Sequence, residues 1–400
     1  MSELNYLEKL LDGVEVEWVT LGSMADIGTG SSNRQDESEN GIYPFYVRSK
    51  NILKSDTFEF DEVAIVIPGE GGIGDIFHYV EGKYALHQRA YRIRITTNAV
   101  DTKFLYYFMS SSFKQYILTK SVGATSISIR KPMLEGFKVP IPCPDNPEKS
   151  LAIQSEIVRI LDTFTALTAE LTAELNMRKK QYNYYRDQLL SFEEGEVKWK
   201  TLGEIGTWHG GGTPSKSRSE FWEDGSIPWI SPKDMGRPIV DTSEDYITEE
   251  AVEQSSTKLV PANSIAIVVR SSILDKVMPS ALIPVPATFN QDMKVVIPHC
   301  NISPNYIAHI MRSRGDDILR AAKKSGGSVA SIDSKKLFSF RIPVPHLNEQ
   351  KRIVNILDKF DTLANSITEG LPREIELRQK QYEYYRDLLF SFPRPETASN

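Results

Sequence analysis

Residue types that commonly carry catalysis or bind metals are sparse in this chain, and their spacing excludes several chemistries. Cys143 and Cys300 lie far apart, so they predict neither a zinc site nor a disulfide framework. The six histidines are scattered, without the His-Glu-x-x-His spacing of a zinc enzyme. The sequence has no Gly-x-Ser-x-Gly nucleophile motif and no Asn-Pro-Pro-Tyr/Phe motif of amino-methyltransferases. We therefore expect no catalytic residue, no metal and no cofactor on this chain.

Two glycine-rich segments match phosphate-binding motifs only in part. Gly69–Gly74 reads Gly-x-Gly-x-x-Gly, but a dinucleotide site needs a helix to begin there, and residues 75–83 predict strands. We expect a tight loop instead. Gly210–Lys216 lacks the Gly-Lys-Ser/Thr ending of a phosphate loop, so it is either flexible or a loop whose N–H groups approach DNA phosphate. Glu81 and Lys83 match half of a nuclease motif that lacks its Pro-Asp half.

Polar loop residues recur at matched places in the two halves of the chain, and Gln88 stands opposite Gln291. The aligned segments are 86–91 with 289–294, and 126–131 with 329–334. Arg, Gln, Asn, Ser and His on loops are the groups that contact base edges and phosphates. For one such residue, a solvated surface side chain is the simpler explanation, but repetition at matched places favours nucleic-acid binding for the set.

We take the following as candidate DNA-binding residues: Arg34, His87, Gln88, Arg89, Ser126, Arg130, Lys131, Gly211, Gly212, Thr213, Ser215, Lys216, Lys233, Arg270, Asn290, Gln291, Lys323, Lys324 and Ser328.

The charge distribution agrees with local basic surfaces. The net charge of −6 argues against nucleic acid only as an average. Residues 1–82 carry 5 basic and 16 acidic side chains, whereas residues 83–138 carry 10 and 2. The same order returns in residues 193–293, with 9 and 16, and in residues 294–341, with 9 and 3. A chain that separates charge twice in one order is building two similar polar faces.

An internal repeat with an offset near 200 residues organises the chain. The matching segments are Trp18–Gly22 with Trp199–Gly203, Phe137–Pro142 with Phe340–Pro345, Ile157–Phe164 with Ile353–Phe360, and Lys180–Phe192 with Lys380–Phe392. Between them the halves diverge, and the second half carries about 22 extra residues between Thr213 and Val268. Similar frames around different inserts indicate one scaffold that presents two surfaces.

The repeated frames predict long helices. Apolar residues recur at 157, 160, 164, 167, 171, 175, 182, 185, 189 and 192, and in the second frame at 353, 356, 360, 363, 367, 375, 382, 385, 389 and 392. This spacing is typical of a coiled-coil seam. Asn146–Glu148 provides an Asn cap, a Pro at the first helical position and an acid. Pro372 should kink or break the second helix.

A tyrosine cluster lies at the end of each predicted helix. Tyr182 and Tyr185 fall on the seam and favour a core between paired helices, whereas Tyr184 and its counterpart Tyr384 do not. Exposed aromatic residues are typical of interfaces. The candidate partner-binding residues are Tyr184, Arg186, Tyr384 and Arg386.

The inserts predict mixed α/β domains of about 140–150 residues, since short β-rich runs alternate with Gly, Pro, Ser and Asn clusters. Each should close with one helix, at Thr102–Lys120 and at Pro304–Lys324. The fold class is therefore mixed α and β, with two similar domains separated by two long antiparallel helices in a pseudo-twofold repeat. The predicted segments are 1–145, 146–192, 193–346, 347–392 and a tail at 393–400. We expect no membrane span and a cytoplasmic location.

Taken together, these motifs resemble the specificity subunit of type I restriction–modification systems. The resemblance lies in the Leu-Gly-Glu-Ile-Gly and Gly-Gly-Gly-Thr-Pro-Ser segments at 202–215, the Phe-x-Ile-Pro-x-Pro exit at 340–345, the segment 348–358 and the Gln-Tyr-x-Tyr-Tyr-Arg-Asp ending. It covers almost the whole chain and is stronger in the second half. The first half departs at Thr29–Arg34 and in its helix entry.

The resemblance implies two target recognition domains, each reading one half of a bipartite, asymmetric site on double-stranded DNA. It implies helices that space these domains and dock two modification subunits, which carry S-adenosylmethionine and methylate adenine. Restriction subunits that use ATP and Mg²⁺ would join them. The chain itself would be a non-catalytic reader. The alternatives are an autonomous DNA methyltransferase or nuclease, which the missing motifs disfavour, and a coiled-coil scaffold that reads no sequence.

Overall fold

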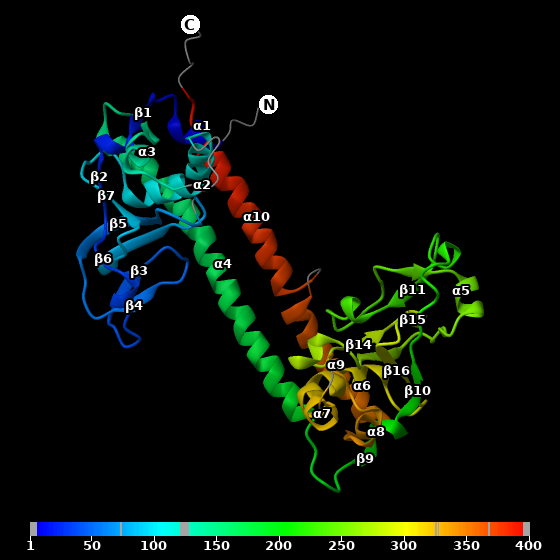
Figure 1. Cartoon of the computed structure of the whole chain (residues 1–400). Helices are drawn as coiled ribbons and strands as arrows, with labels where there is room; N and C mark the ends of the chain where they lie inside the picture. Colours follow the sequence, from blue (N-terminus) through cyan, green and yellow to red (C-terminus); the bar gives the residue numbers. More distant parts are fainter. Residues whose placement is uncertain are drawn as a thin grey trace. The chain divides into compact units, whose positions relative to one another are not determined.

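The computed structural model describes residues 6–72, 74–120, 128–324, 326, 328–366 and 369–394 (Figure 1). The chain divides into two compact units. Unit 1 comprises Met1–Thr172 and Glu374–Asn400, and unit 2 comprises Ala173–Arg373. Each unit joins a β-rich domain to parts of the long helices. We call the β-rich parts the first domain (β1 to β8) and the second domain (β9 to β17).

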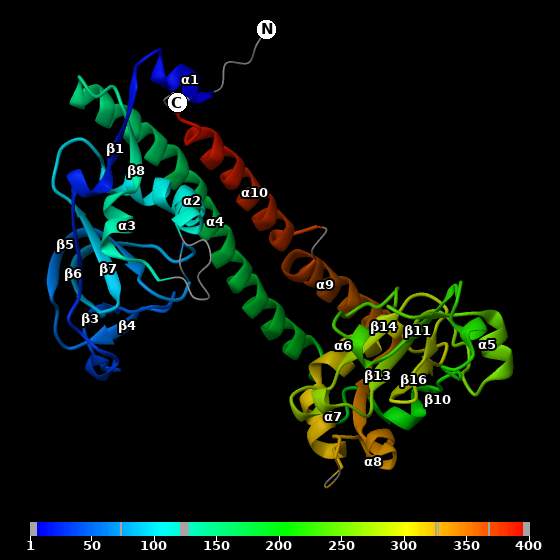
Figure 2. The ribbon, with the colours of Figure 1, turned by 45° about the horizontal axis from the view of Figure 1, so that its top comes forward.

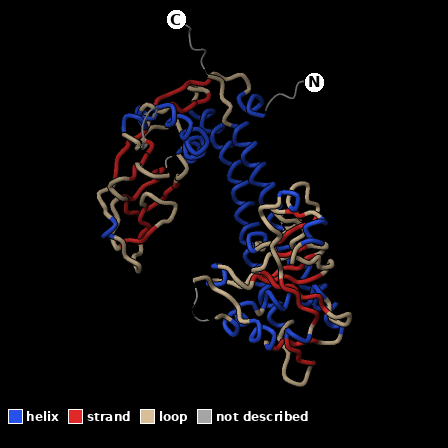
Figure 3. The backbone as a smooth tube through the Cα atoms, turned by 45° about the vertical axis from the view of Figure 1, so that its right-hand side comes forward, coloured by secondary structure: helices blue, strands red, loops and turns tan. Residues whose placement is uncertain are grey.

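Unit 1 is built on a six-stranded sheet with the order β2-β7-β5-β6-β3-β4. Figure 3 shows the strands in red. The strands of unit 1 are β1 (Val16–Thr20), β2 (Ala25–Thr29), β3 (Tyr43–Tyr46), β4 (Leu53–Ser55), β5 (Phe60–Pro68), β6 (His78–Leu86), β7 (Ala90–Ile95) and β8 (Lys138–Pro142). Its helices are α1 (Tyr6–Leu11), α2 (Thr102–Lys120), α3 (Lys131–Glu135), the first part of α4 (Pro147–Leu189) and most of α10 (Leu371–Leu389). β1 and β8 form a separate antiparallel pair.

The core of unit 1 forms where the sheet, α2 and the long helices meet (Figure 2). Ile65 of β5, Phe104 of α2 and Ile157 of α4 are all fully buried in this core. Leu389 and Phe392, from the end of the chain, belong to the same core, and Phe390 packs edge-on against Phe104. The first domain is therefore completed by residues from the second repeat.

Unit 2 repeats this arrangement, except that the strand equivalent to β6 is divided into two shorter strands. Its strands are β9 (Lys198–Thr201), β10 (Gly206–Gly210), β11 (Ile227–Ile230), β12 (Tyr246–Ile247), β13 (Ser264–Val268), β14 (Ser280–Ile283), β15 (Thr288–Phe289), β16 (Met293–Pro298) and β17 (Arg341–Val344). Its helices are the second part of α4, α5 (Glu249–Gln254), α6 (Pro304–Ser313), α7 (Gly315–Ala322), α8 (Ser334–Ser339) and α9 (Leu347–Asn365). The sheet orders are β10-β16-β13-β14 and β12-β11-β15, so β14 and β15 together take the place of β6.

The helix signals in the sequence are confirmed in part. α4 begins at Pro147, and the Asn146 side chain accepts a hydrogen bond from the backbone N–H of Lys149 at 3.1 Å. α2 has the predicted bounds, but the single helix predicted at Pro304–Lys324 is wrong. It is two helices, because the backbone leaves the helical conformation at Arg314. The second frame also breaks, as Pro372 predicts, into α9 and α10.

Each domain is fastened to its long helix by a buried glutamine. Gln154 of α4 accepts a hydrogen bond from the backbone N–H of Asp101 at 2.8 Å and donates one to the carbonyl of Ala99 at 2.9 Å. Gln350 of α9 accepts from the backbone N–H of Ser303 at 2.8 Å and donates to the carbonyl of Pro345 at 2.8 Å. The backbone N–H groups that these two amides bind lie directly before α2 and α6, and both glutamine side chains are almost fully buried.

The long helices pair within each unit through stacked aromatic rings. Phe164 of α4 stacks on Tyr385 of α10 at 5.3 Å in unit 1, and Tyr185 of α4 stacks on Phe360 of α9 at 5.5 Å in unit 2. In unit 1 the early part of α4 meets the late part of α10, so the two helices are antiparallel (Figure 1). Among the described residues, no helix combines the length and apolar character needed to cross a bilayer.

Candidate nucleic-acid interface

The strand order of the first domain brings five loop segments to one edge of the sheet. β3 and β6 are parallel, with Tyr46 opposite Leu86, so the residues that follow them emerge side by side. Pro68 at the end of β5 pairs with Ala90 at the start of β7. We call the loops at this place the first loop edge, and they comprise residues 30–34, 48, 69–70, 87–89 and 128–130.

A glycine and a carboxylate shape the loop that follows β2. A Cβ atom on Gly30 would lie 1.9 Å from the carbonyl oxygen of Leu86, so no other residue fits without moving the backbone. Glu59 accepts hydrogen bonds from the backbone N–H groups of Ser31 at 2.8 Å and Ser32 at 3.2 Å and from both hydroxyls. Burial alone would raise the pKa of Glu59, but the hydrogen bonds from Ser32, Ser31 and Leu86 outweigh it and hold this pKa below its ordinary value.

His87 and Gln88 stabilise the turn between β6 and β7. The Nδ1 atom of buried His87 accepts a hydrogen bond from the backbone N–H of Arg89 at 3.0 Å. Burial, with the nearby guanidinium groups of Arg48 and Arg89, lowers the pKa of His87 and favours the neutral ring. Gln88 is exposed and donates a hydrogen bond to the side-chain oxygen of Asn33.

Arg89 belongs to a three-residue charge cluster. Its guanidinium lies 3.2 Å from the carboxylate of Glu70, and the guanidinium of Arg48 lies 3.1 Å from the same oxygen. Glu70 forms an isolated antiparallel bridge with Ser128, and the backbone N–H of Ile129 donates to the carbonyl of Gly69 at 2.8 Å. These contacts place the charge cluster beside the segment that leads into α3.

The remaining candidates of the first domain lie around this cluster. Arg130 is exposed and precedes α3, and Lys131 lies 3.8 Å from Glu135 one turn later. Arg34 is strongly exposed in the loop that Glu59 holds. The candidate Ser126 lies outside the described residues. Gly71, Gly72 and Gly74 have positive φ, and the strand β6 follows them where a dinucleotide site would need a helix, so the prediction of a loop is confirmed.

The second domain gathers its loops at the equivalent sheet edge. β11 and β15 are parallel, with Ile230 opposite Phe289. A Cβ atom on Gly211 would lie 1.9 Å from the carbonyl oxygen of Asn290, which reproduces the constraint at Gly30. The backbone N–H of Gly212 donates to the carbonyl of Phe289 at 2.8 Å. We call residues 211–213, 231–233, 269–270, 290–292 and 331–332 the second loop edge.

The turn before β16 repeats the turn before β7. The side-chain oxygen of Asn290 accepts a hydrogen bond from the backbone N–H of Asp292 at 2.6 Å, as His87 accepts from that of Arg89. Thr213 donates a hydrogen bond to the side-chain oxygen of Gln291, so each edge joins its glutamine to its glycine loop. The matched placement of Gln88 and Gln291, inferred from the sequence, is therefore present in space.

The other candidates of the second domain divide into free and paired side chains. Arg270 is exposed and bridges to Ser331, and the backbone N–H of Lys324 donates to the carbonyl of Ser331 at 2.9 Å. Lys323 is paired with Asp275 at 2.9 Å. Glu244 and Asp245, at 2.8 and 3.0 Å, raise the pKa of Lys233 above its usual value. Ser215, Lys216 and Ser328 are exposed.

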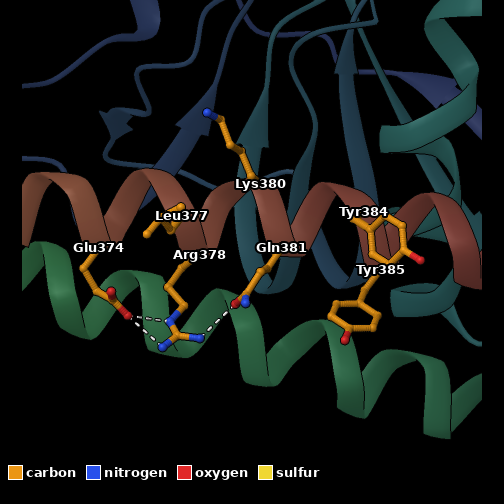
Figure 4. Close-up of a pocket in the computed structure, with 7 residues that line it drawn as sticks. All are labelled: Glu374, Leu377, Arg378, Lys380, Gln381, Tyr384 and Tyr385. Atoms are coloured by element: carbon orange, nitrogen blue, oxygen red, sulfur yellow. Dashed lines mark hydrogen bonds and ion pairs between the residues drawn. The ribbon is translucent and has the colours of Figure 1, made fainter. Parts of the chain in front are cut away.

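The candidate partner-binding tyrosines lie on open helix surfaces. Tyr184 is 62% exposed and Tyr384 is 64% exposed. Arg186 and Arg386 form ion pairs within the chain, each with the aspartate that follows it, at 2.9 and 2.7 Å. On α10, a shallow groove of about 390 Å³ is lined by Glu374, Leu377, Arg378, Lys380, Gln381, Tyr384 and Tyr385 (Figure 4). Figure 4 shows Lys380 pointing away from α4 and Tyr385 pointing toward it.

Three residues of the loop edges were not predicted from the sequence: Arg48, Glu70 and Asp292. Glu59, which binds the loop at Ser31 and Ser32, was not predicted either. Arg48 and Glu70 are about 20 residues apart, and only the register of the sheet brings them together. Asp292 could have been found, since it aligns with Arg89 in the repeat. In the described part of the chain, no group of three His, Cys, Asp or Glu side chains is placed to hold a metal ion.

Two copies of one family model match the chain, at residues 13–178 and 194–377, and the model describes the type I restriction modification DNA specificity domain. Together the two matches cover most of the sequence and follow the repeat. The chain belongs to the specificity subunits of type I restriction–modification systems. This specificity subunit therefore has two DNA specificity domains, one in each half of the repeat.

Relatives of this specificity subunit include curated proteins and solved structures. The EcoR124I/EcoR124II specificity subunit of Escherichia coli is 63% identical over 413 aligned residues, with 100% of both chains covered. The EcoprrI specificity subunit of Escherichia coli is 35% identical, with 92% of this chain and 93% of that protein covered. The fold resembles the crystal structure of an S subunit from M. genitalium, with a TM-score of 0.60, 18% identity and coverage of 96% and 98%.

Proposed function

We propose that this specificity subunit reads one half of a bipartite, asymmetric DNA site with each domain and performs no catalysis itself. The observation that carries this proposal is the repetition of the loop edge. In both domains a glycine-constrained loop, a glutamine and a charged residue meet at the same sheet edge, on turns that share one hydrogen-bond pattern. Loops held by a rigid sheet are the usual carriers of recognition residues.

The electrostatics favour a duplex as the ligand of these edges. Arg130 and Lys324 are exposed cations without a carboxylate partner among the described contacts, and Gln88 and Gln291 are exposed amides on turns. Arg and Lys contact phosphate, and Gln pairs with adenine through two hydrogen bonds in the major groove. The acidic average of the chain fits a reader whose partners supply part of the phosphate contact.

The exposed helix surfaces would dock two modification subunits, and restriction subunits would join that assembly. Tyr184 and Tyr384 occupy equivalent places in the repeat, so two copies of one partner would find the same aromatic anchor. The Arg178–Glu174 pair on α4, at 2.7 Å, returns as the Arg378–Glu374 pair on α10, also at 2.7 Å. S-adenosylmethionine would be bound by the modification subunits, and ATP and Mg²⁺ by the restriction subunits.

Exchange of one domain tests the central part of this proposal. Residues 205–340 are replaced by the corresponding insert of another specificity subunit, and methylated adenines are mapped by single-molecule sequencing after assembly with the modification subunits. The expected result is a new sequence in one half of the methylated site and an unchanged sequence in the other half. A simultaneous change in both halves would contradict independent reading, and methylation by the isolated chain would favour the autonomous enzyme.

Salt dependence tests the phosphate contacts. Arg130→Gln and Lys324→Gln should each reduce the slope of log affinity against log salt by about 0.9, because each removes one phosphate contact. Lys9→Gln is the matched control, since Lys9 is an exposed lysine on α1. Unchanged slopes in both test variants, measured by DNA binding of the assembled complex, would place the DNA elsewhere.

A further inference from the structure

At two equivalent positions, the first and second loop edges carry side chains of opposite charge. In the first domain, Glu70 follows β5 and Arg89 precedes β7. In the second domain, Arg270 follows β13 and Asp292 precedes β16. The residue after the strand is therefore acidic in the first domain and basic in the second. The residue in the turn is basic in the first domain and acidic in the second.

The backbone contacts establish that these positions correspond. The backbone N–H of Gly69 donates to the carbonyl of Arg89 at 2.9 Å, and that of Val269 donates to the carbonyl of Asp292 at 2.8 Å. Glu70 bridges to Ser128 as Arg270 bridges to Ser331. The exchange is therefore a difference of side chains on one shared backbone framework.

In the first domain these side chains form an ordered cluster that solvent reaches. Glu70 contacts both Arg48 and Arg89 through one carboxylate oxygen, at 3.1 and 3.2 Å. The side chains of Arg48, Glu70 and Arg89 are 46%, 44% and 56% exposed. A half-exposed guanidinium held by a carboxylate keeps free N–H groups in a fixed direction, which is the arrangement that two-bond recognition of a base edge requires.

We infer that the Arg48–Glu70–Arg89 cluster determines the base read at one position of the first half-site, and that Arg270 with Asp292 determines it in the second. The inference rests on the proposed function. Arg89 is the group that contacts the base, and Glu70 is a positioning residue that orients it. Arg donates two hydrogen bonds to O6 and N7 of guanine, whereas a carboxylate accepts one from N4 of cytosine.

The exchange then explains how one scaffold reads two different half-sites. At the turn, the first domain presents a donor, which favours guanine as the contacted base, and the second presents an acceptor, which favours cytosine. The turn geometry itself is kept, because His87 and Asn290 accept the equivalent backbone hydrogen bond. The asymmetry of the recognised site would therefore arise from side chains and not from a change of fold.

The test measures base preference position by position in the complex assembled with modification subunits. A library randomised over both half-sites is methylated by the wild type, by Arg89→Gln and by Glu70→Gln. Arg89→Gln should reduce discrimination at one position of the first half-site by about 5- to 150-fold, and Glu70→Gln should reduce it less at the same position. The second half-site should remain unchanged in both.

Two further variants complete the test. Glu70→Arg combined with Arg89→Asp imposes the charge order of the second domain and should change the preferred base at that position, whereas Lys9→Gln should change nothing. Unchanged preferences in Arg89→Gln and Glu70→Gln would overturn the inference. Equal weakening at every position, with a smaller salt slope, would also overturn it, because that result marks a phosphate contact. A wild type that shows no bipartite site would instead refute the proposed function.

Discussion

The two DNA specificity domains are fastened to their helices in the same way and differ in the loops at the sheet edge. Gln154 and Gln350 are almost fully buried and accept hydrogen bonds from equivalent backbone N–H groups, those of Asp101 and Ser303. At the loop edges, by contrast, Glu70 stands where Arg270 stands, and Arg89 where Asp292 stands. The frame requires the same chemistry twice because its groups are buried, whereas the exposed edge can change its charge without loss of the fold.

The two glycine loops show how much a loop can vary within this frame. A Cβ atom added to either Gly30 or Gly211 would lie 1.9 Å from a backbone carbonyl oxygen. The first loop is held by the carboxylate of Glu59, whereas the second is held by backbone contacts and by Trp229, whose indole N–H donates to the carbonyl of Gly212 at 3.0 Å. The close approach of the backbone is the shared requirement, and the side chains that secure it differ.

The largest expected effect falls on the buried glutamines. Gln154→Ala and Gln350→Ala should each lower the free energy of unfolding of their own unit by about 2–4 kcal/mol, because each removes a buried side chain and leaves a partly buried backbone N–H without its partner. Gln188→Ala, at an exposed position of α4, should change it by less than about 0.5 kcal/mol. The free energy of unfolding of each unit is measured for the three variants by denaturation, with hydrogen exchange as the readout. Equal effects of all three variants would show that Gln154 and Gln350 do not stabilise the contact between each domain and its helix.

The glycine loops should tolerate substitution at one position and not at its neighbour. Gly211→Ala should move the backbone, cost about 1–3 kcal/mol and abolish reading of the second half-site, since its Cβ would collide with the carbonyl of Asn290. Gly210→Ala is the matched control, because nothing lies within 4 Å of the Cβ position there. Gly30→Ala should affect only the first half-site. DNA binding to half-site variants measures the outcome, and equal activity of the Gly210 and Gly211 variants would refute the constraint.

Acid should disturb the glycine loop of the first loop edge. The pKa of Glu59 is lower in the folded chain than its ordinary value of 4.5, so the stabilisation that Glu59 provides is present above that value and is lost as the pH falls through the lowered folded pKa. Glu59→Gln should remove this pH dependence, because an amide does not titrate. Hydrogen exchange at Ser31 and Ser32 across that pH range measures the effect. A loop in the wild type that stays protected through the range would contradict it.

The sequence predicts the repeat and the helices well because their signals are local. Asn146 and Pro147 lie at the start of α4, and the bounds of α2 follow from its composition and its flanking residues. The end of a helix is harder to predict where polar and apolar residues continue beyond it, as at Arg314, where α6 stops and α7 begins. The non-helical backbone conformation of Arg314 ends α6, and the pattern of polar and apolar residues does not reveal this conformation.

The loop edges were only partly predictable for a different reason. Gln88, Gln291 and Gly211 stand out because the repeat aligns them. Arg48 and Glu70 do not, since their partnership with Arg89 depends on the parallel pairing of β3 with β6 and on the antiparallel pairing of β5 with β7. Contacts between residues 20 or more apart require the register of the sheet, which no short motif contains.

A pair of matched glutamine variants tests independent reading by two equivalent edges most directly. Methylated adenines are mapped for complexes that contain Gln88→Ala, Gln291→Ala or the wild-type chain. We predict that Gln88→Ala relaxes the sequence only in the first half-site and Gln291→Ala only in the second, each by about 5- to 150-fold at one position, because the proposed reading assigns each glutamine to one base pair. Relaxation of both halves by either variant, or of neither half by both, would contradict the account.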